Sequence, residues 1–276
     1  HLFYLKGEKT KEWENLGPYM IETFAYADKN FGKYPYPHYS IIQAGDGGME
    51  YPMATLITGH RNLKSLVGVC VHEAMHSWYQ GMLATNESLF AWMDEGFTSY
   101  ASNRIEQQLF PEDWPDTHES SYKGYKRIAK SKYEEPLCTH ADHFNTNWAY
   151  GTASYSKGVV ILDQLSHIVG QDILDMSLLR YFKEWSFKHP TASNFKRIVE
   201  RESGIELDWY FDYFVNTTKT IDYAISEFSS TKNGSRILLN KGEMPMPIEL
   251  EVLLTNGDHL LYYIPTVLMR GKKEIE

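Results

Sequence analysis

The sequence predicts an α+β protein, in which a mainly helical domain with a small sheet is followed by the start of a β-rich domain. Two observations support this class. After two short strand-like segments near the N-terminus, and as far as Asp222, apolar residues mostly recur every three or four positions, as in amphipathic helices. After Asp222 the pattern changes to short alternating segments, which are typical of strands. We therefore predict a helical domain over residues 1–228 and a partial β-rich domain over residues 229–276.

The helices are predicted from their apolar spacing and from the residues that end them. They cover residues 9–31, 65–83, 94–110, 155–169, 173–188, 191 or 193 to 203, and 207–215. Gly32 and Gly204 follow two of these segments, as is common at helix C-termini, and Pro190 stops another. Thr191 or Ser193 is expected to cap the helix that Gly204 closes.

The strands are predicted from alternation and from flanking turn residues. They cover residues 39–44, 53–58, 237–239, 248–254 and 259–267. Asn256-Gly257, between the last two, is a strong signal for a tight hairpin turn. The C-terminal strands are the reason for assigning a separate β-rich segment.

Composition limits the classes of function. With 276 residues, 42% hydrophobic and 14% aromatic, the chain can bury an ample core. A net charge of −9 without a basic cluster argues against nucleic-acid binding. The sequence has no run of eighteen apolar residues, so no membrane-spanning helix is expected. Two cysteines, Cys70 and Cys138, cannot form a disulfide framework; a single bond between them and the redox compartment stay open.

Two histidines four residues apart, His72 and His76, lie in the predicted helix over residues 65–83. This spacing places both on one helix face, with Cβ atoms about 5–6 Å apart, which suits nitrogens about 2.0–2.1 Å from one zinc ion. Glu73 lies about a hundred degrees further round the helix, where it can reach water beside the ion. Eighteen residues separate Glu95 from His76. We predict one Zn²⁺ bound by His72, His76 and Glu95, with a fourth position open.

Each half of this pattern has a simpler interpretation. His-Glu-x-x-His occurs by chance in solvated helices, and Glu95 alone would be an ordinary acid near a helix N-terminus. Together, on an apolar helix where buried charges are costly unless paired or metal-bound, they favour the metal site. A second ligand set from Cys138, His140 and His143 is the weaker hypothesis, because these residues lie in a loop-like stretch where a solvated loop is expected.

Four motifs in this order resemble the aminopeptidase N family of the gluzincin metallopeptidases. The first and last of them flank the His-Glu-x-x-His…Glu pattern. Residues 47–51 (Gly-Gly-Met-Glu-Tyr) resemble the exopeptidase motif Gly-x-Met-Glu-Asn, residues 92–97 resemble Trp-Leu-Asn-Glu-Gly-Phe, and residues 155–158 resemble Tyr-x-Lys-Gly. The resemblance covers roughly residues 45–160 and continues weakly to about residue 225. It implies the thermolysin-like α+β catalytic domain of a zinc-dependent aminopeptidase.

The resemblance also implies a role for each matched side chain. Glu73 would be the general base that takes a proton from water and passes it to the leaving amine. Tyr155 would place its phenol on the developing oxyanion. Glu50 would bind the free α-ammonium group of a peptide, so that only the first peptide bond reaches the metal. Further residues are assigned to substrate binding, namely Gly47, Gly48, Met49 and Tyr150.

The glycine run at residues 45–48 has two other interpretations. A phosphate-binding loop is rejected, because residues 49–58 look like a strand, whereas phosphate cradles open a helix. The glycines either let the backbone approach substrate closely or form a turn.

Two positions depart from the family pattern. Tyr51 replaces the usual Asn of the exopeptidase motif, which affects the expected shape of the amine pocket. Asp94 replaces the usual Asn before the third ligand and adds an acidic group beside the metal. Metal-bound histidines usually donate their second nitrogen to an acceptor, and Asp94, Thr98 and Ser99 are the candidates.

Family members carry a large β-rich domain before the catalytic one, and here the motifs begin almost at once. We therefore expect a fragment that lacks this N-terminal β-domain, which in the family supplies part of the amine pocket, so that this piece alone is weakly active or inactive. The chain starts at His1 and shows no targeting segment. An exported or periplasmic parent fits this, and the compartment stays open.

The main prediction is an aminopeptidase that acts on peptides with a free N-terminus. Within enzymes, the alternative is a zinc metalloendopeptidase with the same machinery, which N-terminal acetylation of a substrate would distinguish. From another class, the alternative is a non-catalytic peptide-binding scaffold that kept the fold. Its expected mark is loss of Glu73 or of a ligand, and none of these residues is lost.

Overall fold

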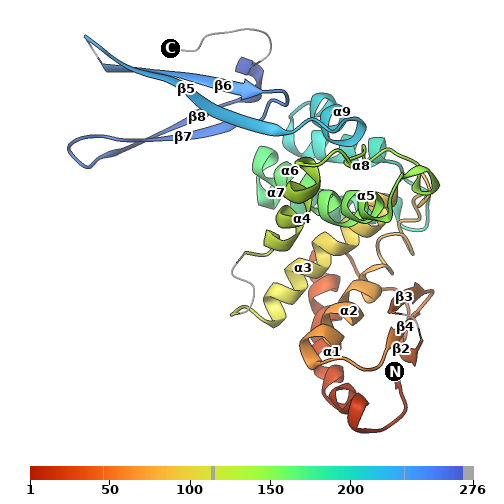
Figure 1. The fold of residues 1–276 in the computed structure, drawn as a ribbon. Coiled ribbons are helices and arrows are strands. Elements are labelled where there is room, and N and C mark those ends of the chain that lie inside the picture. Colours follow the sequence, from red (N-terminus) through yellow and green to blue (C-terminus); the bar gives the residue numbers. More distant parts are fainter. Residues whose placement is uncertain (46, 113–115, 233, 270–276) are drawn as a thin grey trace. The chain divides into compact units, whose positions relative to one another are not determined.

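The computed structural model describes residues 1–45, 47–112, 116–232 and 234–269 (Figure 1). It separates into two compact units, His1–Asn216 and Thr217–Glu276. Helices fill most of the first unit and small sheets complete the two, so the α+β class is confirmed. The predicted boundary at 228/229 falls inside strand β5 (Ile221–Thr231), whose alternation was not recognised. Asp46 of the glycine run and the end of the predicted β-rich segment, residues 270–276, lie outside the described residues.

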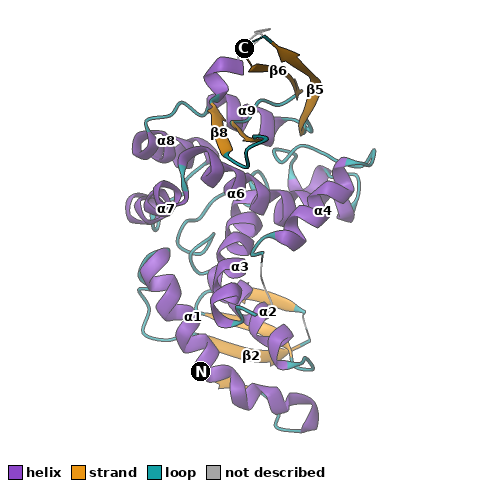
Figure 2. Ribbon diagram, turned by 90° about the vertical axis from the view of Figure 1, so that its left-hand side faces the viewer, coloured by secondary structure: helices purple, strands orange, loops and turns teal. Residues whose placement is uncertain are grey.

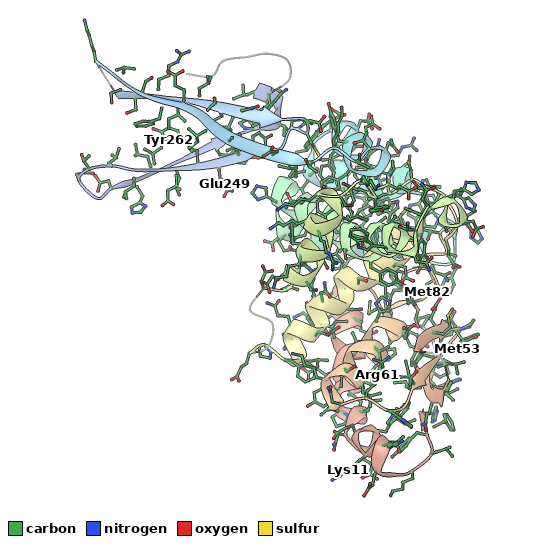
Figure 3. The ribbon with its side chains drawn as sticks, viewed as in Figure 1. Lys11, Met53, Arg61, Met82, Glu249 and Tyr262 are labelled. Carbon is green, nitrogen blue, oxygen red and sulfur yellow. The ribbon has the colours of Figure 1, made fainter. Side chains whose placement is uncertain are left out.

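The first unit holds a mixed sheet near its N-terminus. Its strands lie in the order β1 (Leu2–Phe3), β2 (Ser40–Ala44), β4 (Ala54–Thr58) and β3 (Gly48–Tyr51). Neighbouring strands are parallel except for β3 and β4, which are antiparallel. A single strand over residues 49–58 was therefore wrong. The chain turns at Pro52 and Met53 (Figure 3), where φ of Met53 is 59°. Strand β3, which carries Glu50, thereby becomes the edge strand.

The N-terminal helix is shorter than predicted. A 3₁₀ helix, η1 (Glu8–Asn15), precedes α1 (Leu16–Asn30). Pro18 lies in the first turn of α1, where its missing N–H costs no helical hydrogen bond. Gly32, with φ of 118°, follows the helix as predicted.

The helix that carries the two histidines is α2 (Leu63–Met75). Asn62 caps it, because its side chain accepts the N–H of Ser65 at 2.9 Å. The predicted end at residue 83 was wrong. Gly81 folds back onto the helix end and donates its N–H to the carbonyl of His76 at 2.8 Å. A Cβ on Gly81 would lie 2.9 Å from two carbonyl oxygens, so this close approach requires glycine. In Figure 1, α2 lies between the sheet and helices α1 and α3 (Phe97–Leu109).

The remaining helices of the first unit follow in chain order. They are η2 (Trp92–Gly96), α3, α4 (Glu119–Ala129), η3 (Ala141–His143), α5 (Asn147–Gly151), η4 (Thr152–Lys157), α6 (Gly158–Val169), α7 (Gln171–Trp185), α8 (Ala192–Ser203) and α9 (Asp208–Asn216). Of these, α4, η3 and α5 were not predicted. Thr191, rather than Ser193, caps α8 in a capping box with Asn194, and Gly204 closes it with φ of 70°. Within the described part of the chain, no helix combines the length and apolar character that crossing a membrane requires.

An aromatic core lies where α2 ends and α3 begins. Phe97, the first residue of α3, is 1% exposed and packs edge-on against Phe195 of α8, with ring centroids 4.9 Å apart. Tyr79, just beyond α2, contacts Phe97 at 5.3 Å, and Tyr181 of α7 contacts Phe195 at 5.2 Å. Burying these rings fixes the start of α3 relative to the end of α2.

The second unit consists of two antiparallel hairpins and a short helix (Figure 2). Strand β5 pairs with β6 (Gly234–Gly242), and β7 (Ile248–Leu253) pairs with β8 (His259–Ile264), before η5 (Thr266–Met269). The predicted turn between β7 and β8 is confirmed, with φ of 89° at Gly257. Strand β6 is longer than the predicted residues 237–239. The prediction was too short, because the ends of the strand carry glycine and polar residues that hide the alternation.

Candidate functional site

Three potential ligand atoms converge at the C-terminal end of α2. Nε2 of His72 lies 3.2 Å from Nε2 of His76 and 3.2 Å from Oε2 of Glu95. Nε2 of His76 lies 3.3 Å from the same carboxylate oxygen. Ligands about 2.0–2.1 Å from a tetrahedral zinc ion are about 3.3 Å apart, so this triangle has the edges that one such ion requires. The structure thus brings together the three residues that the sequence proposed as ligands.

Glu95 reaches this point from a π-helical turn. It lies in η2, directly before α3, so the helical run begins before Asp94, where the sequence placed its start. Trp92 and Met93 of the same turn are 1% and 2% exposed and anchor it in the core. A π turn inserts an extra residue into the helical repeat and is frequent at functional sites. Apolar spacing does not distinguish it from an α-helical turn.

The second ring nitrogen of His76 is surrounded by acceptors. Nδ1 lies 3.0 Å from the carbonyl oxygen of Tyr79, 2.7 Å from Oδ1 of Asp94 and 3.3 Å from Oγ1 of Thr98. Of the candidates from the sequence, Asp94 and Thr98 therefore lie at this nitrogen, and Ser99 is not among its partners. Burial would lower the pKa of His76, but Asp94 and Glu95 raise it well above its ordinary value. Burial raises the pKa of Asp94 to about 6, against the opposing effect of His76.

Two carboxyl groups of the site have pKa values shifted in opposite directions. Burial would raise the pKa of Glu95, but hydrogen bonds to His72 and His76 hold it well below its usual range. Burial raises the pKa of Glu73 to about 7, and His76 opposes this shift while Glu50 adds to it. One carboxylate is thus stabilised as an anion, and the other titrates near neutrality, as suits a general base.

Glu73 is fixed from the side of the sheet. It is 6% exposed, and a Cβ on Gly48 would overlap its Oε1. Gly48 therefore leaves room for this carboxylate, a role that the sequence did not suggest. Ligand atoms of Glu50, Glu73 and His76 lie within 4.8 Å of one another, which places the carboxylate of edge strand β3 next to the triangle.

Tyr155 approaches the triangle at His72 and Glu95. Its hydroxyl donates to Oε1 of Glu95 at 2.5 Å, and its ring stacks on His72, with centroids 5.8 Å apart and an angle of 19°. The phenol is 37% exposed, and burial followed by the charge of Glu95 raises its pKa far above the ordinary value. The predicted helix start at Tyr155 was wrong. The residue lies inside the π-helical segment η4, which continues from α5 and leads into α6.

These groups line one cavity of about 310 Å³. Its lining residues are Gly48, Met49, Glu50, His72, Glu73, His76, Glu87, Ser88, Ala91, Asp94, Glu95, Ala141, Tyr150 and Tyr155. Gly47 is not among them, and its carbonyl accepts a hydrogen bond from Nη2 of Arg61 at 2.9 Å. Glu87 and Arg61 were missed, because no local pattern shows that the chain beyond α2 returns to the cavity or that Arg61 reaches the β3 loop.

The other candidate sites do not form. Cys70 is buried and Cys138 is exposed, and both are free, so the disulfide between them is excluded. Among the described residues, the groups of side chains placed to share a metal are His72, His76 and Glu95, and the overlapping Glu50, Glu73 and His76. Cys138, His140 and His143 do not form such a group.

Residues 19–214 match the family described as the Peptidase family M1 domain. Human Aminopeptidase B is 31% identical over 218 residues, which cover 72% of this chain and 31% of that protein. Leukotriene A-4 hydrolase from Xenopus laevis is 28% identical over 220 residues, covering 70% of this chain and 35% of that protein. The chain thus spans about a third of the length of these curated relatives.

Solved structures share the fold. The M1 zinc metallopeptidase from Deinococcus radiodurans superposes with a TM-score of 0.58 at 18% identity, covering 72% of this chain and 42% of that one. Aminopeptidase A from Legionella pneumophila, solved with aspartic acid, superposes with a TM-score of 0.74 at 14% identity, covering 95% of this chain and 32% of that one. The chain belongs to peptidase family M1. The resemblance to the aminopeptidase N family is thereby confirmed.

Proposed function

We propose that the chain carries the catalytic centre of a zinc-dependent aminopeptidase, which hydrolyses the N-terminal peptide bond of peptides. The observation that carries the proposal is the triangle of His72, His76 and Glu95, with Glu73 beside it. The names of the relatives and neighbours, aminopeptidases and zinc metallopeptidases, support it.

The donor set fits one zinc ion. With its proton on Nδ1, toward the carbonyl of Tyr79, a neutral His76 directs the lone pair of Nε2 at the point shared with His72 and Glu95. Two imidazole nitrogens and one carboxylate oxygen are the ligands typical of a catalytic zinc site with an open position. When bound, zinc supplies a Lewis acid that lowers the pKa of water and polarises a carbonyl group.

Glu73 is proposed as the general base. Burial raises its pKa to about 7, so near neutral pH it can both accept a proton from water and release it to the leaving amine. Its place in α2, next to a proposed ligand, and the space left by Gly48 orient the carboxylate beside the triangle.

Tyr155 is proposed to stabilise the oxyanion. Its hydroxyl is held at Glu95 by a 2.5 Å hydrogen bond, and the partly exposed ring faces the cavity. Its single O–H proton, which Glu95 accepts in the structure, would turn to the developing oxyanion, where a hydrogen-bond donor stabilises the transition state. Tyr150 lines the same cavity and is proposed to contact substrate.

Glu50 is proposed to bind the substrate's α-ammonium group. In an amino acid the α-nitrogen lies only about 2.5 Å from its own carbonyl carbon. Because Glu50 lies next to Glu73 and His76, an ammonium group at Glu50 would place the first carbonyl, rather than a later one, at the triangle. Met49 lines the cavity beside it, which supports a part in contacting the first residue.

The experiment compares cleavage of one peptide with a free and an acetylated N-terminus, by this chain and by a longer parent that includes the N-terminal β-domain proposed as its partner. We expect zinc-dependent cleavage of the free peptide, loss on acetylation and loss in Glu73→Gln. Equal cleavage of both peptides would favour an endopeptidase. A zinc-loaded parent that is as inactive as Glu73→Gln would favour a peptide-binding scaffold.

A further inference from the structure

We infer that Asp94 is a positioning residue for the metal centre, whose carboxylate lies against the His76 imidazole and, through its charge, strengthens the binding of zinc by that ring. The inference rests on the proposed metal site, but it concerns a side chain outside the ligand set. The family motif that residues 92–97 resemble has Asn at this position, where this chain has Asp94.

The imidazole of His76 is bracketed by two adjacent carboxylates. Oδ1 of Asp94 lies 2.7 Å from Nδ1, and Oε2 of Glu95 lies 3.3 Å from Nε2. Both acids belong to the π-helical turn η2, which is anchored by buried neighbours. One turn of the chain therefore supplies one proposed ligand of the ion and the charged partner of another.

The contact is buried on both sides. Asp94 is 5% exposed and His76 is 3% exposed. Within the described part of the chain, Oδ1 of Asp94 has no conventional hydrogen-bond donor, so the ring nitrogen is the polar group beside it. An ionised carboxylate in such a place is costly unless a positive partner compensates it. An imidazole whose far nitrogen binds a cation is such a partner.

The neutral groups at the same nitrogen cannot substitute for the charge. The carbonyl of Tyr79 lies along the N–H direction, and the hydroxyl of Thr98 donates to that carbonyl at 3.1 Å. Both can fix the ring and its tautomer. A carboxylate additionally makes Nε2 a stronger donor to the metal, which is the effect of carboxylate partners in carboxylate–histidine–zinc arrangements.

The test is zinc affinity of the full chain, measured by competition with a chromophoric chelator, for the wild type, Asp94→Asn and Glu87→Gln. Asp94→Asn keeps the shape and removes the charge. Glu87→Gln removes an equal charge from the same cavity, where Glu87 and His76 interact electrostatically. We expect Asp94→Asn to weaken zinc binding about 10–100-fold, and Glu87→Gln to change it less than about threefold.

Each outcome decides a different point. An unchanged affinity in Asp94→Asn, or equal weakening in both variants, would overturn the inference. The contact between Asp94 and His76 would then contribute nothing beyond the long-range electrostatic effect of any carboxylate in the cavity. A wild type that binds no zinc would instead overturn the proposed metal site itself. Far-UV circular dichroism of the zinc-free proteins monitors folding, and Asp94→Ser, which is smaller, replaces Asp94→Asn if that variant does not fold.

Discussion

Gly96 and Gly158 face one another so closely that a Cβ on either would lie 2.7 Å from the Cα of the other. Gly96 ends η2, the π-helical turn that carries Glu95, and Gly158 directly follows η4, the one that carries Tyr155. Two segments far apart in sequence thereby approach at backbone distance. This approach allows the 2.5 Å hydrogen bond between Tyr155 and Glu95.

Replacement of Gly158 by Ala should separate these two segments. The added methyl group meets backbone rather than a flexible side chain, so we expect a loss of about 1–3 kcal/mol of unfolding free energy. Peptidase activity should fall with it, because Tyr155 moves away from Glu95. Urea unfolding measures the first effect. Gly151→Ala is the matched control: no atom lies within 4 Å of its added Cβ, and stability should stay equal or rise.

Tyr155→Phe should lower kcat by about 10²–10³-fold with little change in KM, because the phenol is proposed to act on charge that develops only in the transition state. Zinc content should not change, since Tyr155 contacts Glu95 through the oxygen that is not in the ligand triangle. Steady-state kinetics with an amino-acid amide, together with metal analysis, measure both. An unaltered kcat would remove Tyr155 from the proposed chemistry.

Local spacing was sufficient for part of the site. The positions of His72 and His76 follow from an i, i+4 pair on a helix, and the structure places their Nε2 atoms 3.2 Å apart. Glu95 was found through its motif, but its π-helical turn was not, because a single extra residue in a turn leaves the apolar pattern intact.

The rest of the site depends on tertiary contacts, which local sequence patterns do not show. Gly48 was predicted as a substrate-binding glycine; it lines the cavity and also makes room for the carboxylate of Glu73, a residue of another element. Glu87 joins the cavity only because the chain leaves α2 earlier than its apolar residues suggest. Strand β5 was missed, because its burial alternates only over its first residues and later apolar residues such as Phe228 are exposed.

Lys157→Met should destabilise the protein by about 3–5 kcal/mol, because it leaves the buried carboxylate of Glu134 without its partner. Lys157 and Glu134 have side chains 1% and 6% exposed, with Nζ and Oε1 2.9 Å apart. Lys123→Met is the surface control. Its partner Glu119 is 57% exposed, so the loss should stay below about 1 kcal/mol. Equal losses of stability in the two variants, measured by thermal unfolding, would contradict the distinction between a buried and an exposed ion pair.

Stability should fall as pH rises from about 4.5 to 7 because of Glu106 in α3. Burial raises its pKa from 4.5 to about 7, while Lys64 opposes the shift. In this window the folded state binds the proton that the unfolded state has released, so the contribution is present below the unfolded pKa and lost above the folded one. Glu106→Gln should therefore raise the free energy of unfolding by on the order of 1–2 kcal/mol relative to wild type at pH 8, and change it little at pH 4.

Urea unfolding across pH 4–8 measures this difference, with exposed Glu22→Gln as the control for removing one carboxylate. The comparison isolates Glu106 because other titrating groups contribute equally to both curves and cancel in the difference. A constant offset between Glu106→Gln and wild type at all pH values would mean that the carboxyl group titrates alike in the folded and unfolded chains. A gain confined to pH 4 would reverse the sign and contradict the burial argument directly.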